Sequence, residues 1–353
     1  MESEKEIGTE LFGCNSCGAD LIYKPGTVKL KCEYCGAEND IPQIDELVEE
    51  LDFEKYLNNK VESEDSITVK FIKCNGCGAS SSFPKNVTST NCPYCSTPLV
   101  LDQAKDEKLI QPKSLLPFKI NQDESKYEVK KWISKLWFAP NDLQKAVLNF
   151  EQFKGIYIPY WTFDLDTYSD YTGQRGQYYY VKSGDKKVRK TRWYPASGRV
   201  TKFFDDILTP ASKSLPKKYI NKLEPWDLEN LVPYDKNYLS GFVTEKYQVD
   251  LKEGFEISKT ISDDKIRHLV RRDIGGDTQR IYRINTNYND ISFKHLLLPV
   301  YVSSFKYKNK AFQFLVNGRT GEVQGERPYS WVKILLTILV GLIVIGAIYY
   351  WQY

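Results

Sequence analysis

The chain repeats one cysteine pattern twice, as CNSCGADLIYKPGTVKLKCEYCG at residues 14–36 and as CNGCGASSSFPKNVTSTNCPYCS at residues 74–96. Each copy holds two Cys-x-x-Cys pairs separated by 14 residues, and the copies lie 60 residues apart. Two such pairs can supply the four sulfurs of a tetrahedral zinc site. The pattern therefore predicts two closed, structural zinc sites. Their ligands are Cys14, Cys17, Cys32 and Cys35 in the first ribbon, and Cys74, Cys77, Cys92 and Cys95 in the second.

Glycine follows the second cysteine in three of the four pairs, at Gly18, Gly36 and Gly78. Glycine tolerates a positive φ and leaves backbone amides free to face the thiolates. Ser96 takes the fourth of these positions and is the one departure from the pattern.

Disulfides and a redox dithiol are the alternatives for these cysteines. Because both copies have two Cys-x-x-Cys pairs at the same 14-residue separation, zinc is favoured over disulfides and over a redox dithiol. All eight cysteines lie before residue 100, which is not the distribution of a secreted disulfide scaffold. Residues 1–10 contain no apolar stretch, so we expect no signal peptide and a reducing cytoplasm. His268 and His295 lie far from the cysteines in sequence and are not expected to bind metal.

An uncharged apolar stretch of 17 residues, ILLTILVGLIVIGAIYY, occupies residues 334–350. Trp331 precedes it and Trp351 follows it, as in the aromatic belts of membrane helices. With these flanks the segment approaches the ~20 residues that span a bilayer. A buried core helix is the alternative, but the stretch is apolar on every face, which favours a membrane helix.

The charges around this stretch predict its orientation. Lys333, Arg327 and Arg319 precede it and no charged residue follows, so the positive-inside rule places the preceding chain in the cytoplasm. We therefore expect a single-pass tail anchor in the bacterial inner membrane, with a cytoplasmic N-terminus. Gly341 and Gly346 do not have the small-xxx-small spacing of a helix dimer, so the sequence predicts no oligomeric state.

The fold class expected from these features is α+β, with a β-rich body and few helices. The chain has 25 Tyr, 17 Phe and 7 Trp, and aromatic residues favour strands. The predicted organisation is zinc ribbon 1 at residues 1–40, an acidic helical linker at 41–66, zinc ribbon 2 at 67–103, the body at 104–330 and the membrane helix at 331–353.

Within this organisation we expect one helix over residues 41–60 and another over residues 123–137, with a connecting segment at 104–117. The remaining body is expected to be strands and turns. A hairpin with its tip at residues 183–185 and a turn at Asn317-Gly318 are predicted. The segments around Pro159 and Pro299 resemble one another, which suggests an internal duplication of two hairpin units.

Charge and missing motifs exclude several function classes. The net charge is only +3 and the first 65 residues are acidic, so nucleic acid is an unfavoured partner. The sequence contains no phosphate-binding glycine loop, nucleophile elbow or zinc-protease motif, and it has two histidines. We therefore expect no enzyme. A basic run could contact lipid headgroups or form a solvated edge strand. It consists of Lys186, Lys187, Arg189, Lys190 and Arg192.

The whole pattern resembles a bacterial family of tail-anchored zinc-ribbon membrane proteins, often labelled primosomal protein N-prime or superfamily II helicase-like. The resemblance rests on the paired ribbons, the PYWTFD motif at residues 159–164, the VNGRTG motif at 316–321 with GERP at 325–328, and the terminal apolar stretch. Some members are encoded beside phage-shock-protein-A-type membrane-remodelling proteins. The resemblance implies an adaptor that brings such a partner to the bilayer.

The function expected from the sequence is therefore that of a membrane-anchored adaptor. Its two zinc ribbons would present a cytoplasmic surface to a cytoplasmic or membrane-associated protein, such as a membrane-remodelling or stress protein. The first alternative is a membrane-tethered nucleic-acid-binding factor that lacks ATPase motifs. The second is an enzyme whose site lies in the β-rich body.

Overall fold

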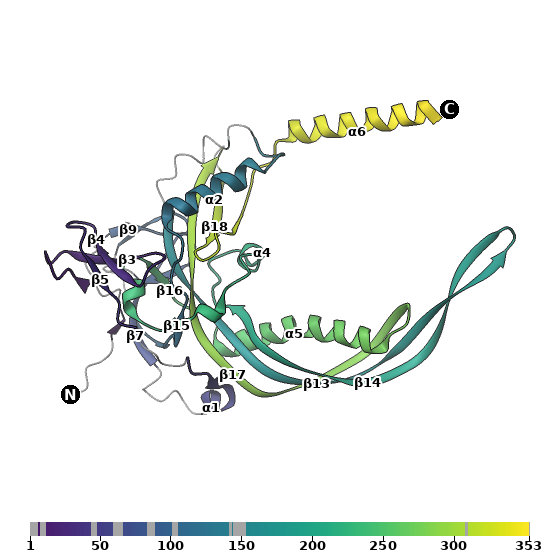
Figure 1. The fold of residues 1–353 in the computed structure, drawn as a ribbon, viewed down its shortest axis with the longest axis horizontal. Coiled ribbons are helices and arrows are strands. Elements are labelled where there is room, and N and C mark those ends of the chain that lie inside the picture. Colours follow the sequence, from purple (N-terminus) through teal and green to yellow (C-terminus); the bar gives the residue numbers. More distant parts are fainter. Residues whose placement is uncertain are drawn as a thin grey trace.

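The computed structural model describes residues 6–7, 12–43, 48–58, 66–82, 89–100, 105–140, 143, 153–307 and 310–352. Within these residues the fold is α+β and rich in strands, which confirms the predicted class. A long curved arm of strands extends from a head region (Figure 1). The cysteine-rich strands lie on the side of the head away from the arm, and the C-terminal helix points away from the head (Figure 1).

The arm is built on β13 (Phe153–Ser183), a strand of 31 residues. It pairs antiparallel with β17 (Thr278–Tyr307) on one side and with β14 (Lys186–Pro210) on the other. Tyr, Ile, Val and Thr recur in these strands, and such residues favour β structure. The strands β13 and β14 meet in a turn at Gly184, whose φ is +61°, so the predicted hairpin tip is confirmed.

Two register shifts lie at the base of the arm. The pairing of β13 with β14 shifts at Asp164, and its pairing with β17 shifts at Leu165. The partner strands have a positive φ nearby, +49° at Asp206 and +48° at Asp290. Such β-bulges bend a sheet and redirect side chains. Here they accompany the curvature of the arm (Figure 1).

Helix α5 (Leu251–Ile274) was not predicted and corrects the expectation of strands and turns for this segment. It lies along the inner side of the curved arm (Figure 1). The helix begins after Asp250, whose carboxylate caps the first turn, and it ends at Gly275 with φ +66°. Its buried face includes Ser258 and Ser262. These serines weaken the apolar periodicity by which a helix is recognised in a sequence.

The acidic linker contains less helix than predicted. Helix α1 covers only Phe53–Asn58, and β6 (Leu51–Asp52) precedes it and pairs with β17. The carboxylate of Asp52 accepts a hydrogen bond from the backbone N–H of Lys55, which starts the helix after β6. Pairing with the sheet therefore replaces the expected helix at residues 51–52, and residues 41–43 and 48–50 are not helical either. Residues 44–47 and 59–60 of the expected helix lie outside the described residues.

The segment expected to connect ribbon 2 to the body contains two strands instead. They are β11 (Lys105–Ile110) and β12 (Ser114–Leu115). Strand β11 pairs with β7 (Ser66–Lys73), and β12 pairs with β17. The sequence of β11 is polar and does not alternate between apolar and polar residues. Only its pairing with β7 therefore identifies it as a strand. The helix expected over residues 123–137 is present as α2 (Gln122–Ser134).

Ribbon 1 forms a sheet of its own, whereas ribbon 2 continues into the main sheet. In ribbon 2, β8 (Ser80–Ser82) pairs with β16 (Val243–Glu245), and β16 pairs with β13. The second hairpin of this ribbon is β9 (Ser89–Asn91) with β10 (Pro98–Val100). Ribbon 1 consists of β2 (Phe12–Gly13), β3 (Asp20–Lys24), β4 (Lys29–Cys32) and β5 (Glu38–Asp40). The exact domain boundaries stay predictions.

The two ribbons pack on different apolar clusters of the head. Ribbon 1 packs in a cluster with Tyr157 and Leu297, whereas ribbon 2 packs in a cluster with Ile156, Ile158 and Leu296. Alternate residues of a strand point to opposite faces of a sheet. The ribbons therefore cover opposite faces of the β13–β17 pair and do not form one joint unit.

The Pro159 and Pro299 segments pair with one another. In the β13–β17 register, Ile158 lies opposite Leu298, Pro159 opposite Leu297, and Tyr157 opposite Pro299. Each proline thus lies one residue after the shared Ile158–Leu298 pair. This symmetric placement is compatible with the duplication, which stays a prediction. The Asn317-Gly318 turn links β18 (Lys310–Asn317) to β19 (Val323–Gly325), as predicted.

Helix α6 (Trp331–Gln352) is long and apolar enough to cross a membrane, and its apolar window is not buried. Its N-terminal end is held by the head. The amine of Lys333 donates to the carbonyl of Ala139 at 2.8 Å, and the N–H of Ser330 donates to the carbonyl of Phe138 at 2.7 Å. A core helix would be covered by other elements. The helix therefore fits a single-pass membrane protein.

Candidate metal centres

The first ribbon brings its four cysteine sulfurs together. Sγ of Cys14 lies 3.6 Å from Sγ of Cys35, and Sγ of Cys17 lies 3.6 Å from Sγ of Cys32. All four sulfurs lie within 4.8 Å of one another. The β3–β4 hairpin sets the separation of the two cysteine turns. The predicted residues thus form one group that could hold a metal ion.

The second ribbon repeats this geometry. Sγ of Cys74 lies 3.5 Å from Sγ of Cys95, and Sγ of Cys77 lies 3.6 Å from Sγ of Cys92. These four sulfurs also lie within 4.8 Å of one another. Among the described residues, these two cysteine groups are the ones that could hold a metal ion, and neither includes a histidine.

The sulfur–sulfur distances fit one tetrahedral ion in each group. Metal–sulfur bonds of about 2.3 Å place tetrahedral sulfurs roughly 3.8 Å apart. A disulfide would bring two sulfurs to about 2.05 Å. The eight thiols are all unbridged, so the disulfide alternative does not fit the structure. Four thiolates in a tetrahedron are a donor set for zinc or iron.

Backbone amides face the sulfurs of Cys14 and Cys74, the first cysteine of each ribbon. The N–H of Ser16 lies 3.4 Å from Sγ of Cys14, and this contact lowers the pKa of the thiol to about 6. The N–H of Gly76 makes the matching contact with Sγ of Cys74 at 3.3 Å. A thiolate is the form that binds a metal. These turns are therefore preorganised for a cation.

The residue after each cysteine pair has a positive φ. The values are +75° at Gly18, +76° at Gly36 and +78° at Gly78. A Cβ added at these glycines would meet no atom within 4 Å. Glycine is therefore required by the positive φ, not by a lack of space. Ser96 has φ +62° and is the only residue of the four that bears a side chain. The predicted positive φ is confirmed at all three glycines.

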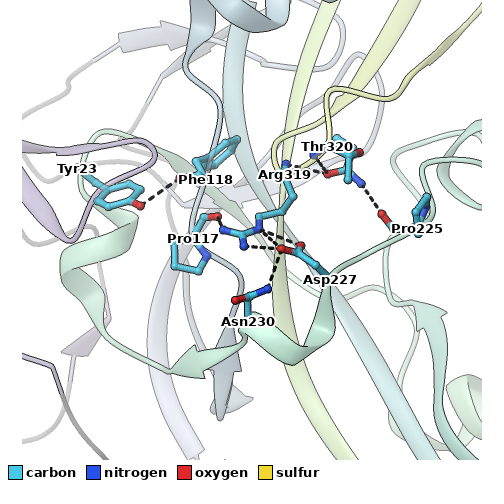
Figure 2. A network of polar contacts seen from close by, with 9 residues as sticks. Tyr23, Pro117, Phe118, Pro225, Asp227, Asn230, Arg319 and Thr320 are labelled. Atoms are coloured by element: carbon cyan, nitrogen blue, oxygen red, sulfur yellow. Dashed lines mark hydrogen bonds and ion pairs between the residues drawn. The ribbon is translucent and has the colours of Figure 1, made fainter.

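Tyr23 fixes the first ribbon to the body. Its hydroxyl donates to the carbonyl of Phe118 at 3.1 Å, a contact drawn in Figure 2. Its ring meets that of Tyr238 edge-on, with 5.1 Å between ring centroids. The hydroxyl of Ser240 also donates to the carbonyl of Leu21 at 2.6 Å. The first metal centre is therefore held rigidly against the head.

Tyr94 fixes the second ribbon from inside its last cysteine turn. Its hydroxyl donates to Oε2 of Glu245 at 2.8 Å, while Ser212 donates to Oε1 of the same carboxylate at 3.0 Å. Burial raises the pKa of Glu245 to about 7, in spite of these donors. Glu245 lies on β16, which also pairs with the ribbon. The second metal centre is thus built into the main sheet.

The tyrosine at the matching position of the first ribbon is placed differently. Tyr34 and Tyr94 are 60 residues apart and each precedes the last cysteine of its ribbon. Tyr94 is 4% exposed, whereas Tyr34 is 85% exposed. Tyr34 is therefore an aromatic side chain on a rigid turn that remains open to solvent.

The VNGRTG motif has a structural role. The guanidinium of Arg319 donates to both carboxylate oxygens of Asp227, and its Nη1 donates to the carbonyl of Pro117 at 3.1 Å (Figure 2). The side chain of Asn317 accepts the N–H of Arg319 at 2.8 Å and donates to the carbonyl of Leu223 at 2.8 Å. The motif thus joins the β18–β19 turn to two other segments of the head.

Four charged residues meet at the base of the arm, and of these the sequence analysis named only Asp164, as the end of the PYWTFD motif. Nζ of Lys294 lies 2.9 Å from Oδ1 of Asp206, 3.0 Å from Oε1 of Glu50 and 3.8 Å from Oδ2 of Asp164. Burial and the neighbouring Glu50 raise the pKa of Asp164 to about 7. The bulges bring these residues together, and a bulge leaves no signal in the sequence. The cluster ties the linker to the arm.

The basic run lies on β14 beside the hairpin tip and is mostly exposed. Its arginines stack on tyrosines of β13. The guanidinium of Arg189 lies 4.3 Å from the ring centre of Tyr178, and that of Arg192 lies 5.3 Å from that of Tyr179. An exposed strand of this kind fits the prediction of a solvated edge. The headgroup contact stays a prediction.

The chain is similar to the uncharacterized protein YdjG of Bacillus subtilis (strain 168), with 27% identity over 326 residues. The similarity covers 92% of this chain and 91% of that protein, so it is not confined to the two ribbons. No protein-family model matches the chain. No solved structure matches it either.

Proposed function

We propose that this protein is a membrane-anchored zinc-ribbon adaptor, and that the first ribbon presents its protein-binding surface. The contrast between Tyr34 and Tyr94 carries this proposal. Tyr94 shows how a tyrosine on this turn can dock, because its ring is buried against the head and its hydroxyl donates to the carboxylate of Glu245. Tyr34 stands on an equivalent turn and is exposed. Exposed tyrosines on rigid elements are frequent anchors of protein interfaces.

Each cysteine group would hold one zinc ion in a structural role. The four thiolates of each group complete a tetrahedral shell, and a closed shell leaves no position for a substrate. Zinc binding would supply the folding free energy that ribbons of this size lack. The metal would therefore shape the turns that carry Tyr34 and Tyr94.

The helix α6 would anchor the adaptor with its head in the cytoplasm. Lys333 and Arg327 precede the apolar stretch, and the positive-inside rule assigns them to the cytoplasmic side. Arg319 does not contribute to this flank, because it is paired with Asp227 inside the head. These two flanking cations support the same orientation as the sequence analysis.

The expected partner is a folded cytoplasmic or membrane-associated protein, such as a membrane-remodelling or stress protein. By analogy with the Tyr94 site, it would offer an apolar recess with a carboxylate at its base. Such a recess would accept both the ring and the hydroxyl of Tyr34. Tethering to the bilayer would raise the local concentration of the captured partner at the membrane.

Cross-linking in the native cell, followed by purification of the full-length protein in mild detergent, tests this function. Tyr34→Ala should lose a defined protein that wild type retains, with its metal content unchanged. Tyr127→Ala is the matched control, because Tyr127 is also exposed but lies on α2. Equal recovery of the partner by both variants would contradict a docking role for the first ribbon.

A membrane-tethered nucleic-acid-binding factor is the second candidate. The exposed cations and tyrosines beside the hairpin tip favour it, because aromatic and basic side chains together bind single strands. This function predicts salt-dependent binding of DNA or RNA that is lost when the cations at residues 186–192 are replaced by glutamine. Recovery of nucleic acid without any protein would favour it over the adaptor.

A further inference from the structure

The turn that follows α2 exposes two large apolar side chains. Trp132, Ile133 and Leu136 of the same segment pack on the apolar cluster that also holds the first ribbon. Trp137, in contrast, is 74% exposed, and the neighbouring Phe138 is exposed as well. Large apolar side chains that are exposed together mark a contact surface. The turn therefore has an apolar face that the described part of the head does not cover.

This turn is fixed to the base of α6, and Figure 1 shows the end of α2 beside the start of α6. The N–H of Ser330 donates to the carbonyl of Phe138 at 2.7 Å, and the amine of Lys333 donates to the carbonyl of Ala139 at 2.8 Å. Trp331, at the start of α6, is also exposed. The exposed aromatic side chains thus gather where the apolar helix leaves the head.

Trp137 lies beside the apolar part of α6. The two form an open groove of about 560 Å³, which is lined by Trp137, Lys333, Leu336, Thr337 and Val340. The uncharged stretch begins at Ile334. Because an α-helix rises 1.5 Å per residue, Val340 lies about 9 Å further along the helix axis. When α6 crosses a bilayer, the groove is therefore level with acyl chains and not with the aqueous phase.

We propose that the turn at Trp137 and Phe138 inserts into the leaflet at which α6 enters the bilayer, and that phospholipid acyl chains fill the groove between Trp137 and α6. This proposal rests on the membrane anchoring proposed above. Acyl chains that cover the exposed surface of α6 also cover a groove that is continuous with it. Tryptophan suits this place, because its ring is apolar and its N–H can donate to headgroup oxygens. Two contacts restrict the orientation of the head on the bilayer more than one helix does.

Photo-cross-linking of the full-length protein in nanodiscs of phosphatidylethanolamine and phosphatidylglycerol tests the proposal. The photoreactive residue p-benzoylphenylalanine replaces Trp137, Tyr127 or Leu342, and adducts are identified by mass spectrometry. Leu342 lies within α6 and reports its insertion, whereas Tyr127 is an exposed control on α2. We expect lipid adducts at positions 342 and 137, and few or none at position 127.

The other outcomes separate the turn from the anchor. Lipid adducts at position 342 without any at position 137 would overturn the proposal and leave the anchor intact. No lipid adduct at position 342 would overturn both. Equal lipid adducts at positions 127 and 137 would overturn the proposal, and so would a protein adduct in place of lipid at position 137, which would assign the groove to a second helix.

Two variants complete the test, with the photoreactive residue in place of Phe138. Trp137→Asp should reduce the yield of lipid adducts at position 138 by about 3- to 10-fold, because a short anionic side chain is unfavourable among acyl chains. Tyr127→Asp introduces the same charge on α2 and should leave this yield unchanged. Both side chains are exposed, so metal content should match that of wild type in both variants. Equal yields from the two variants would overturn the proposal.

Discussion

The hydroxyl of Tyr94 lies 2.8 Å from Oε2 of Glu245, and this hydrogen bond joins the second metal turn to the main sheet. We predict that Tyr94→Phe lowers the free energy of unfolding by about 1–2 kcal/mol, because a buried carboxylate loses a donor. Urea unfolding of the full-length protein measures the change. Tyr34→Phe is the matched control and should stay within about 0.5 kcal/mol of wild type. Equal effects would show that Tyr94 does not fix the ribbon.

Metal analysis of freshly prepared, reduced protein should give about two zinc ions per chain, since each group of four cysteines fits one ion. The double variants Cys14→Ser/Cys17→Ser and Cys74→Ser/Cys77→Ser should each lose one. The second should also lower the melting temperature more, because β8 of that ribbon pairs with the main sheet. A zinc content near zero in the wild type, or iron in its place, would contradict the zinc assignment.

Ser96 is held at φ +62°, where the three matching turns have glycine. A side chain costs roughly 1–2 kcal/mol in this conformation, so Ser96→Gly should raise the free energy of unfolding by about 1 kcal/mol. Gly78→Ala, on the other turn of the same ribbon, should lower it by a similar amount. Chemical denaturation of both variants checks the signs. A loss of stability in Ser96→Gly would mean that the serine side chain contributes more than the strain costs.

His295 should make stability depend on pH in the mildly acidic range. Its Nδ1 lies 2.9 Å from the carbonyl of Ile110, and burial lowers the pKa of the ring to about 4. The unfolded chain has a histidine pKa near 6.5, so it binds the proton more readily than the folded protein. The contribution of His295 is therefore complete above about pH 6.5 and is lost toward pH 4, by up to about 1.4 kcal/mol per pH unit.

Urea unfolding across this pH range measures the slope for wild type and for His295→Gln. The free energy of unfolding of His295→Gln should vary less steeply with pH than that of wild type, by the equivalent of about one bound proton. Loss of metal in acid affects both proteins, so it does not contribute to the difference in their free energies of unfolding at a given pH. His268→Gln is an exposed control and should follow the wild-type curve. A His295→Gln slope equal to that of wild type would refute the prediction.

Features with local signals could be predicted from the sequence. The cysteine groups and the apolar helix depend on residues that are close together in the chain, and so does the hairpin tip at Gly184. Helix α5 was missed because Ser258 and Ser262 interrupt its apolar face. The linker helix was overestimated because β17 pairs with residues 51–52, and the sequence alone does not reveal this pairing.

The environments of individual residues required the structure. Tyr34 and Tyr94 have the same sequence context, yet one is exposed and the other is buried against a carboxylate 151 positions away. Arg319 precedes the apolar stretch in the sequence, but in the structure it is paired with Asp227 inside the head. The Lys294 cluster depends on two bulges. Each of these features arises from contacts between distant segments, which residue spacing does not encode.

If the first ribbon docks a protein through Tyr34, a reactive group at this position should reach that protein. The most direct measurement replaces Tyr34 with the photoreactive residue p-benzoylphenylalanine in the full-length protein and irradiates the native cells. The same replacement at Tyr127 is the control. We expect a discrete cross-linked protein at position 34 that is absent at position 127. No protein adduct at position 34, or the same adducts at both positions, would contradict it.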